Sequence, residues 1–345
     1  MKLALALVLV AACGGGGGSN NTDGGGGDDN TGDDAGSGSN PGSDAGSGSQ
    51  GCASGTVSNG IECVPIDAND PAQRAQADVC TRWAADHVLT DNHPFTAGAG
   101  DCDDGTLSAG GKADTLKRIN GFRWLVGLGP TTESASLDAT DQECANMESW
   151  WDFSSGGSPH QPPSTTKCYT ATAASGAGMS NIAWGQGPAQ SIDQFMEDNG
   201  NETTLGHRRW IMNPKLGPVG VGYWQGGGQY GSAECLAVFG MSGTSNVPKW
   251  VAQPNPGFVP VVITTWTWSF SSAIAGTAAA TIKMTRMSDG MNLQVTRMTL
   301  TQGYGQDTIS WKPMGWTPTA GETYKVTVSG LTGGDVSYVV KPISC

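Results

Sequence analysis

The chain has few side chains that could act as an acid, a base or a metal ligand near neutral pH. It contains four histidines among its 345 residues. Two of them lie in turn-rich polar segments, His160 in Ser-Pro-His and His207 in Gly-His-Arg-Arg-Trp-Ile-Met-Asn-Pro. A neutral imidazole can bind a metal ion or transfer a proton at physiological pH. We therefore take His160 and His207 as the first candidates for chemistry.

Common catalytic and phosphate-binding motifs are missing from the sequence. There is no Gly-x-Ser-x-Gly elbow, no His-Glu-x-x-His pair and no phosphate-binding loop. Arg208 and Arg209 could form an anion site, but such a pair more often holds a helix end or pairs with a carboxylate such as Glu202. The net charge is −13 and no basic cluster is visible. We therefore expect no nucleic-acid partner.

The elements that must position these residues are predicted from hydrophobic periodicity and turn signals. Helices are expected over 71–87, from an N-cap at Asp114 to 126, and over 137–151, 188–199 and 205–212. Segments 219–224 and 233–239 predict a hairpin around a glycine-rich loop. Six further strands are expected between 261 and 340. Helices followed by strands indicate an α+β protein.

Five segments between residues 116 and 240 resemble one known family, in the order expected for it. They are NGFRWLVGLGP at 120–130, NIAWG at 181–185, GHRRWIMNP at 206–214, VGVG at 219–222 and CLAVFG at 235–240. This pattern is similar to the CAP family of cysteine-rich secretory proteins, antigen 5 and pathogenesis-related 1 proteins, in its bacterial SCP-like branch. The resemblance implies an α-β-α sandwich for this part of the chain.

The resemblance also implies a site. Family members gather two histidines and two acidic residues in one open cleft, which binds zinc in some of them. His160 and His207 correspond to the histidines, and Asp198, or Glu197 in a shifted register, corresponds to one acid. Ser180 stands where the family has a glutamate. Because zinc needs three or four ligands, we expect no required cofactor, with zinc or another divalent metal at the two histidines as the alternative.

Nine cysteines are present, and removing Cys13 from the count leaves eight. An even number in an exported protein predicts four disulfides, although the sequence cannot choose among 105 pairings. Since short loops close easily, we expect sequential pairing. The predicted pairs are Cys52–Cys63, Cys80–Cys102, Cys144–Cys168 and Cys235–Cys345.

The N-terminus predicts export and lipid anchoring. An apolar run follows Lys2 and is too short to span a membrane. It ends in Val-Ala-Ala-Cys, which resembles the lipobox of bacterial lipoproteins and implies cleavage before Cys13 and acylation of that residue. Residues 14–51 are rich in glycine, serine and aspartate, a composition typical of a disordered tether. We therefore expect an extracytoplasmic membrane-anchored lipoprotein, at the outer membrane if the host has two membranes.

Together these patterns predict five regions. They are a signal peptide at 1–12, a lipidated cysteine and tether at 13–51, a small disulfide-stapled extension at 52–111, a CAP-like domain at 112–245 and a C-terminal domain at 258–345. The last region reads as an all-β, immunoglobulin-like sandwich because its short strands alternate apolar and polar residues.

Three functions are compatible with these expectations. We favour a non-catalytic extracytoplasmic binding module for a lipid, a glycan, another small molecule or a protein. A metal-dependent hydrolase that uses the His160/His207 cleft is one alternative, although it would need an open coordination position and a general base. A structural or adhesive envelope protein that makes contact through the sandwich is the other. Beyond the membrane, the partner is left open.

Overall fold

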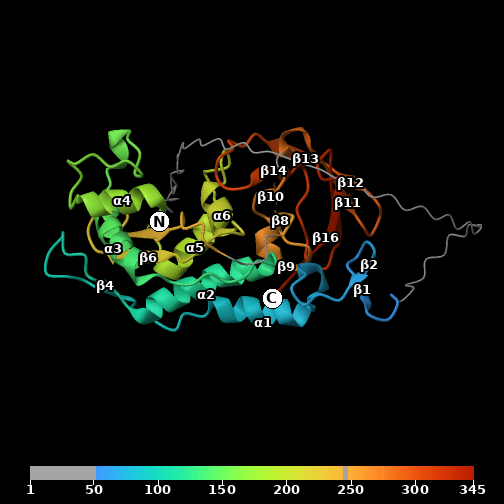
Figure 1. Cartoon of the computed structure of the whole chain (residues 1–345), viewed down its shortest axis with the longest axis horizontal. Coiled ribbons are helices and arrows are strands. Elements are labelled where there is room, and N and C mark those ends of the chain that lie inside the picture. The colour runs from blue at the N-terminus through green and yellow to red at the C-terminus, as the bar shows by residue number, and fades with distance from the viewer. Residues whose placement is uncertain (1–51, 244–247, 275) are drawn as a thin grey trace, which may run out of the picture.

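The computed structural model describes residues 52–243, 248–274 and 276–345. The predicted signal peptide, Cys13 and the tether lie outside these residues. Helices around a small sheet form one part of the molecule, and two larger sheets form the other (Figure 1). This arrangement confirms the α+β class. The described helices include none that is long and apolar enough to cross a membrane.

The first part has three layers. Its central antiparallel sheet has the strand order β5-β7-β6. Cys235 of β7 is bonded to Cys144 of α3, whereas the preceding residue, Glu234, lies beside Ser191 of α5. Because successive side chains of a strand point to opposite faces, α3 and α4 cover one face and α2 and α5 cover the other. The elements are α2 (Ala109–Leu125), α3 (Ala135–Ser149), α4 (Ala171–Met179), β5 (Ser180–Trp184), α5 (Pro188–Glu197), α6 (Gly206–Ile211), β6 (Gly220–Gln225) and β7 (Ser232–Ala237).

Two glycines let α3 lie directly on β6. A Cβ atom at Gly222 would lie 2.0 Å from the carbonyl oxygen of Asp141, and one at Gly220 would lie 2.5 Å from the Asp141 carboxylate. Real Cβ atoms do not approach other atoms this closely, so any side chain at either position would push the helix away. The close contact places Asp141 over the sheet.

The region before α2 forms small elements against both parts of the molecule. Helix α1 packs on α2, where Arg118 donates a hydrogen bond to the carbonyl of Asp86 (2.9 Å). Helix α2 begins at Ala109, earlier than predicted, because Ser108 is its N-cap and accepts a hydrogen bond from Gly111 (2.9 Å). The elements are β1 (Thr56–Ser58), β2 (Cys63–Pro65), the 3-10 turn Pro71–Gln73, α1 (Gln76–His87), β3 (Phe95–Thr96) and β4 (Thr106–Leu107).

The second part consists of two sheets packed face to face. Their strand orders are β13-β14-β10-β8 and β12-β11-β15-β16-β9, and β16 and β9 form the parallel pair. The indole of Trp311 on β14 reaches the sulfur of Met284 on β11 (3.3 Å), so the two sheets share a core. The strands are β8 (Trp250–Gln253), β9 (Gly257–Pro260), β10 (Trp268–Ser272), β11 (Thr281–Arg286), β12 (Asn292–Leu293), β13 (Val295–Met298), β14 (Asp307–Pro313), β15 (Tyr324–Ser329) and β16 (Val336–Ile343).

One predicted strand, over 261–270, differs from the structure. The chain instead forms a helical turn, α7 (Val261–Thr264), and then β10. This turn carries the chain from the sheet of β9 to the sheet of β10, so tertiary packing overrides the strand preference of Val261, Val262 and Ile263. Strand β8 also pairs with β10 in the four-stranded sheet, although it lies ahead of residue 258, where the C-terminal domain was expected to begin.

Arginines of α6 connect the two parts. Arg208 is almost fully buried and donates to the carbonyls of Met196 (2.6 Å) and Glu197 (2.8 Å) at the end of α5, and to that of Thr267 before β10. Arg209 donates to the carbonyls of Thr301 and Gln306, each at 2.9 Å. Burial lowers the pKa of both arginines to about 10, so both keep their charge at neutral pH. The pair therefore holds a helix end and also joins the two parts.

Three of the four predicted disulfide pairings are wrong. The structure contains Cys52–Cys63, as predicted, but the other bonds are Cys80–Cys345, Cys102–Cys168 and Cys144–Cys235. The predicted pairs Cys80–Cys102, Cys144–Cys168 and Cys235–Cys345 were chosen for their short loops. Loop length changes closure entropy only slowly, so the geometry of the packed fold decides the pairing.

The contact between α3 and β6 gives a stability prediction. We expect Gly222→Ala to lower the free energy of unfolding by about 3 kcal/mol or more, because the added methyl group cannot be accommodated without moving α3. Thermal or denaturant unfolding measures the loss. Gly178→Ala is the matched control, since its Cβ would meet only the carbonyl of His160 at 3.6 Å and alanine favours the α4 helix. Equal stability of the two variants would contradict the close contact.

Candidate functional site

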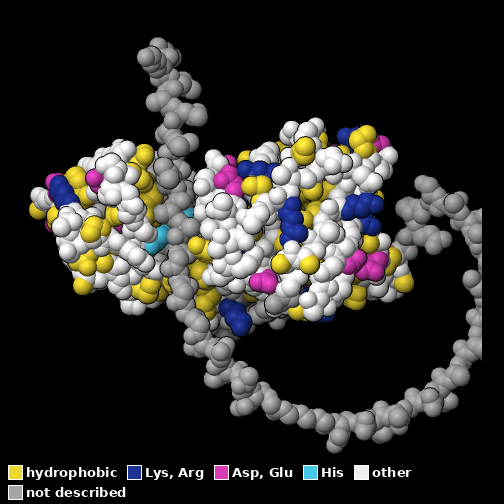
Figure 2. Space-filling view, turned by 90° about the horizontal axis from the view of Figure 1, so that it is seen from above, with side chains coloured by type: hydrophobic (Ala, Val, Ile, Leu, Met, Phe, Trp, Pro, Cys, Tyr) yellow, Lys and Arg dark blue, Asp and Glu magenta, His cyan; other side chains and the backbone are white. Residues whose placement is uncertain are grey.

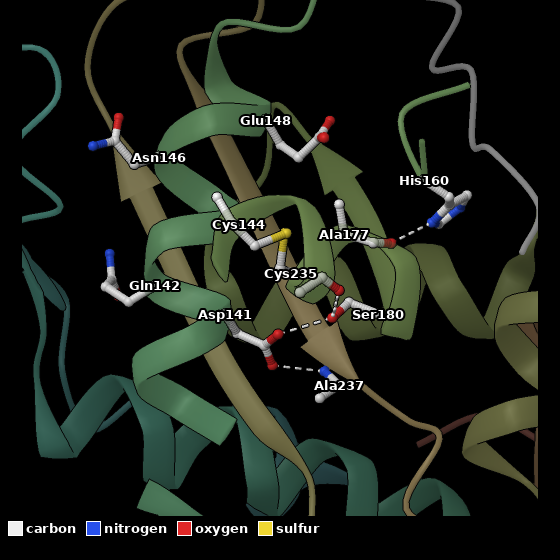
Figure 3. The surroundings of a disulfide bond; sticks show 12 residues. Asp141, Gln142, Cys144, Asn146, Glu148, His160, Ala177, Ser180, Cys235 and Ala237 are labelled. Atoms are coloured by element: carbon white, nitrogen blue, oxygen red, sulfur yellow. Dashed lines mark hydrogen bonds between the residues drawn. A yellow bond between two sulfur atoms is a disulfide. The ribbon is translucent and has the colours of Figure 1, made fainter. Parts of the chain in front are cut away.

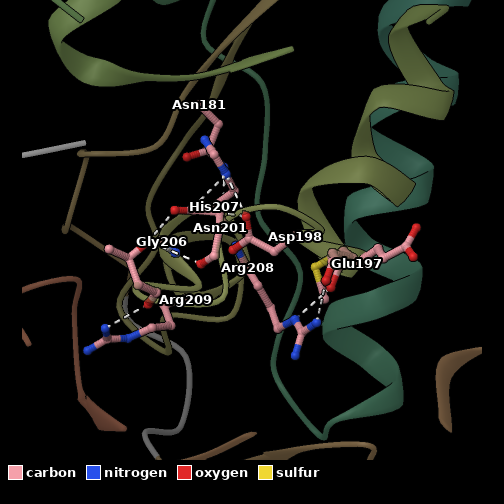
Figure 4. A network of polar contacts seen from close by, with 10 residues as sticks. Asn181, Glu197, Asp198, Asn201, Gly206, His207, Arg208 and Arg209 are labelled. Atoms are coloured by element: carbon pink, nitrogen blue, oxygen red, sulfur yellow. Dashed lines mark hydrogen bonds and ion pairs between the residues drawn. The ribbon is translucent and has the colours of Figure 1, made fainter. Parts of the chain in front are cut away.

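His207 is held by a buried carboxylate (Figure 4). Its Nδ1 lies 2.7 Å from Oδ1 of Asp198, and both side chains are fully buried. An ionised carboxylate can only accept a hydrogen bond, so Nδ1 of His207 carries a proton and donates it to Asp198. Asn201 donates to the same Asp198 oxygen (3.1 Å). The arrangement fixes the orientation and the tautomer of the ring.

The backbone around His207 adopts two uncommon conformations. Asp198, after the last turn of α5, has φ 57°, and Leu205, before the first turn of α6, has φ 47°. Asp tolerates the left-handed region, but a bulky residue such as Leu adopts it only when the surroundings demand it, at a cost of about 1–3 kcal/mol. The fold therefore accepts strain to place His207 against Asp198.

Ser180 binds a second buried carboxyl group (Figure 3). Its Oγ lies 2.8 Å from Oδ1 of Asp141 and 2.8 Å from the carbonyl of Gly176. The other oxygen of Asp141 accepts from the amide of Ala237 (2.8 Å). Burial raises the pKa of Asp141 to about 8, so the carboxyl group is mostly protonated at neutral pH. The neutral acid can donate to Ser180, and Ser180 can then donate its one proton to Gly176.

His160 and His207 both contact the junction between α4 and β5. Nδ1 of His160 lies 2.7 Å from the carbonyl of Ala177 in the last turn of α4 (Figure 3). At the start of β5, the side chain of Asn181 donates to the carbonyl of His207 (3.1 Å). The junction thus connects the two histidines, with Ser180 between the two contacts.

The acidic positions implied by the family resemblance have different roles here. Asp198 is hydrogen-bonded to Nδ1 of His207, so it orients the ring and does not occupy the position of a metal ligand. Glu197 is exposed, and its side chain points away from His207 in Figure 4. Within residues 52–243, 248–274 and 276–345, no three His, Cys, Asp or Glu side chains converge as metal ligands. The residues of this region therefore do not fit a zinc site of three or four ligands.

A pocket of about 420 Å³ lies elsewhere on the three-layer part, at the loop end of the β6–β7 hairpin. Its walls come from five segments: the loop after α1, the first turns of α2, the loop after β5, the N-terminal end of α5, and the hairpin. We call it the hairpin pocket. Its volume lies within the range of small-molecule sites. The lining side chains used below are Asp91, Asn92, Asp114, Gln186, Gln190, Tyr223, Gln225, Tyr230 and Ser232.

The hairpin pocket is rich in polar groups that are not used by the fold. The amide side chains of Asn92, Gln186, Gln190 and Gln225 make no hydrogen bond to another described residue. By contrast, the hydroxyl of Ser232 is used in the fold, since it donates to the carbonyl of Gln186 (2.9 Å). The pocket can therefore offer several hydrogen-bond donors and acceptors to a ligand.

Sequence reasoning did not find this pocket because its walls lie far apart in the chain. Asp91 and Tyr230 are separated by more than a hundred residues, and no short motif links them. Two segments carried a signal for the pocket. Gln186 and Gln190 flank Gly187-Pro188 at the start of a predicted helix. Tyr223 and Tyr230 lie on either side of the glycine-rich loop. Both segments flank motifs that the sequence analysis had already placed in one domain.

The protonated Asp141 gives a pH prediction. Its folded-state pKa of about 8 exceeds the ordinary value of 3.8, so between these pH values the folded chain keeps a proton that the unfolded chain releases. Stability therefore falls as pH rises through this window, by up to about 1.4 kcal/mol per pH unit. Asn at this position can donate the same hydrogen bond without titrating. We expect the stability of Asp141→Asn relative to the wild type to rise by up to roughly 4 kcal/mol between pH 5 and pH 8.

Denaturant unfolding at both pH values measures this effect. Asp78→Asn, on the exposed side of α1, serves as the control and should keep the wild-type pH dependence. Glu148 and Glu234 are also fully buried, and burial raises their pKa values well above normal, so some pH dependence should persist in every variant. An Asp141→Asn variant whose stability changes with pH as much as that of the wild type would show that Asp141 is already ionised.

Comparison with known proteins gives one match. Residues 116–239 match the family model described as CAP, the cysteine-rich secretory protein family. The matched segment begins in α2, ends just after β7, and contains His160, Ser180, Asp198 and His207. No curated protein and no solved structure matches the chain. The three-layer part of the chain is therefore similar to the cysteine-rich secretory protein family.

Proposed function

We propose that the chain is a non-catalytic extracytoplasmic binding module and that its hairpin pocket takes a glycan. The observation that carries this proposal is a pocket whose lining combines unused amide side chains with the rings of Tyr223 and Tyr230. Sugars present many hydroxyl groups and apolar ring faces, so they need hydrogen-bonding side chains on some walls and a flat aromatic surface on another.

Tyr230 supports this assignment. Its side chain is only partly buried, and its ring packs edge-on against Phe153 with centroids 4.9 Å apart. A Cβ atom added at the neighbouring Gly185 would lie 3.8 Å from the Cβ of Tyr230, so the two residues are in close contact. The ring is thus held in place while part of it stays accessible, as a stacking surface requires.

Surface charge favours a small-molecule ligand over nucleic acid. On the face in Figure 2, Lys and Arg side chains lie at separate places and do not form one continuous patch. The whole chain carries a net charge of −13. A nucleic-acid partner would need a concentrated positive surface.

Two alternatives from the sequence remain predictions. A metal-dependent hydrolase at His160 and His207 would need ligands that the described residues do not bring together. An adhesive envelope protein would make contact through the C-terminal sheets, whose immunoglobulin-like arrangement is likewise a proposal. Neither alternative accounts for the hairpin pocket, so we favour the binding module.

The glycan proposal is tested by titrating the full-length chain with mono- and disaccharides and following the ligand signals by NMR. We expect Tyr230→Ala to weaken binding by about tenfold or more, the effect of losing one aromatic contact. Gln190→Ala should also weaken binding, whereas Gln229→Ala, exposed on the neighbouring loop and outside the lining, should not. Binding that is unchanged in Tyr230→Ala and Gln190→Ala would place the ligand elsewhere.

We further propose that the protein is an exported lipoprotein anchored through Cys13. The support is the short apolar run that ends in Val-Ala-Ala-Cys. Two or more acyl chains would give a stable anchor. Labelled palmitate should enter the wild type and be absent from Cys13→Ala, which should leave the membrane fraction. Cys52→Ala, which removes a cysteine of the folded part, should still be labelled. Equal labelling of wild type and Cys13→Ala would refute the anchor.

A further inference from the structure

The charged side chains that line the hairpin pocket are all acidic. Among the described residues that line it, Asp91 and Asp114 are the charged ones, and no Lys, Arg or His belongs to the lining. Asp114 is almost fully buried, and its charge is balanced by Lys117, whose ammonium lies 2.9 Å from Oδ1. Asp91 has no such cation, because it forms no salt bridge with any described residue.

Asp91 is held in place as an anion. Its two carboxylate oxygens accept hydrogen bonds from the amide of His93 (2.9 Å) and from the hydroxyl of Ser108. These two contacts keep the pKa of Asp91 below its usual range, with the Ser108 hydroxyl as the larger cause. A carboxylate oxygen has two lone pairs, so Asp91 can accept further hydrogen bonds from a ligand.

A third acid lies beneath the pocket. Glu234 is the cross-strand partner of Tyr223 and stands two residues after Ser232, and both of these residues line the pocket. By strand alternation all three side chains project from the same face of the sheet. Glu234 is fully buried beside Ser191, and burial raises its pKa well above normal, which favours the neutral acid.

The rings of Tyr223 and Tyr230 complete the surroundings. The face of a phenol ring attracts a cation through its quadrupole, and this attraction grows when water is excluded. A positive group in the pocket would therefore meet the Asp91 carboxylate, which no cation neutralises, and two aromatic rings. A ligand of negative charge would meet repulsion from the Asp91 carboxylate.

Resting on the glycan proposal, we propose that the ligand of the hairpin pocket carries a protonated amine. The pocket then selects an amino sugar over a neutral sugar of the same shape. Asp91 receives the ammonium group, the tyrosine rings pack against it, and the amide side chains of Gln186 and Gln190 bind the hydroxyl groups.

Three sugars with one ring shape test this proposal: glucose, N-acetylglucosamine and glucosamine. Each is titrated into the full-length chain and followed by NMR near pH 6.5. We expect glucosamine to bind about tenfold tighter than the two neutral sugars, the factor that one ion pair or cation–π contact provides. Raising the salt concentration should weaken glucosamine binding and leave glucose binding unchanged.

Asp91→Asn should reduce the affinity for glucosamine to that for glucose and leave glucose binding as it was. Glu62→Gln is the matched control, because it removes one negative charge from the exposed β1–β2 hairpin. It should keep the preference for glucosamine. The salt titration uses the wild type alone, so it decides the question even if Asp91→Asn does not fold.

The outcomes separate the two proposals. If none of the three sugars binds, the glycan proposal is overturned and the amine inference with it. If glucose and glucosamine bind equally, or if the preference for glucosamine survives either high salt or Asp91→Asn, the amine inference alone is overturned and the pocket remains a site for neutral sugars.

Discussion

The buried guanidinium of Arg208 is the contact on which the arrangement of this molecule most depends. It donates to carbonyls at the end of α5 and before β10, so one side chain holds both the three-layer part and the C-terminal sheets. Removing a cation from water costs several kcal/mol, and multiple charge-assisted hydrogen bonds offset that cost. Because Arg208 directly follows His207, the same short helix fixes the histidine and joins the two parts.

This position has a consequence for how the histidine region is built. Asp198 ends α5 next to the carbonyls that Arg208 binds, and its carboxylate turns back to Nδ1 of His207. On the other side, Ser180 contacts Asp141, a carboxyl group supplied by α3 across the sheet. The family resemblance implied a glutamate on β5 itself. Here the strand carries a hydroxyl group, and an acid from another layer reaches it because Gly220 and Gly222 let α3 approach.

Local patterns predicted the local elements well. Helix α5 and the β6–β7 hairpin follow from turn residues and periodicity that lie within each segment. Helix α4 was missed because its small residues, Ala-Thr-Ala-Ala-Ser-Gly-Ala-Gly-Met, form no apolar stripe. The role of Arg208 and the walls of the hairpin pocket depend on contacts between distant segments, which periodicity does not encode. The family resemblance did identify the three-layer part, since its motifs keep their order along the chain.

The disulfide connectivity also constrains how the chain can be made. After Cys63, no cysteine is bonded to the next one along the sequence, and the Cys102–Cys168 and Cys144–Cys235 loops interleave. A chain oxidised in the order in which its thiols emerge would trap Cys80 with Cys102. Reaching the native set then requires thiolate attack on bonds already formed, a slow exchange without a catalyst. A disulfide isomerase would shorten this exchange.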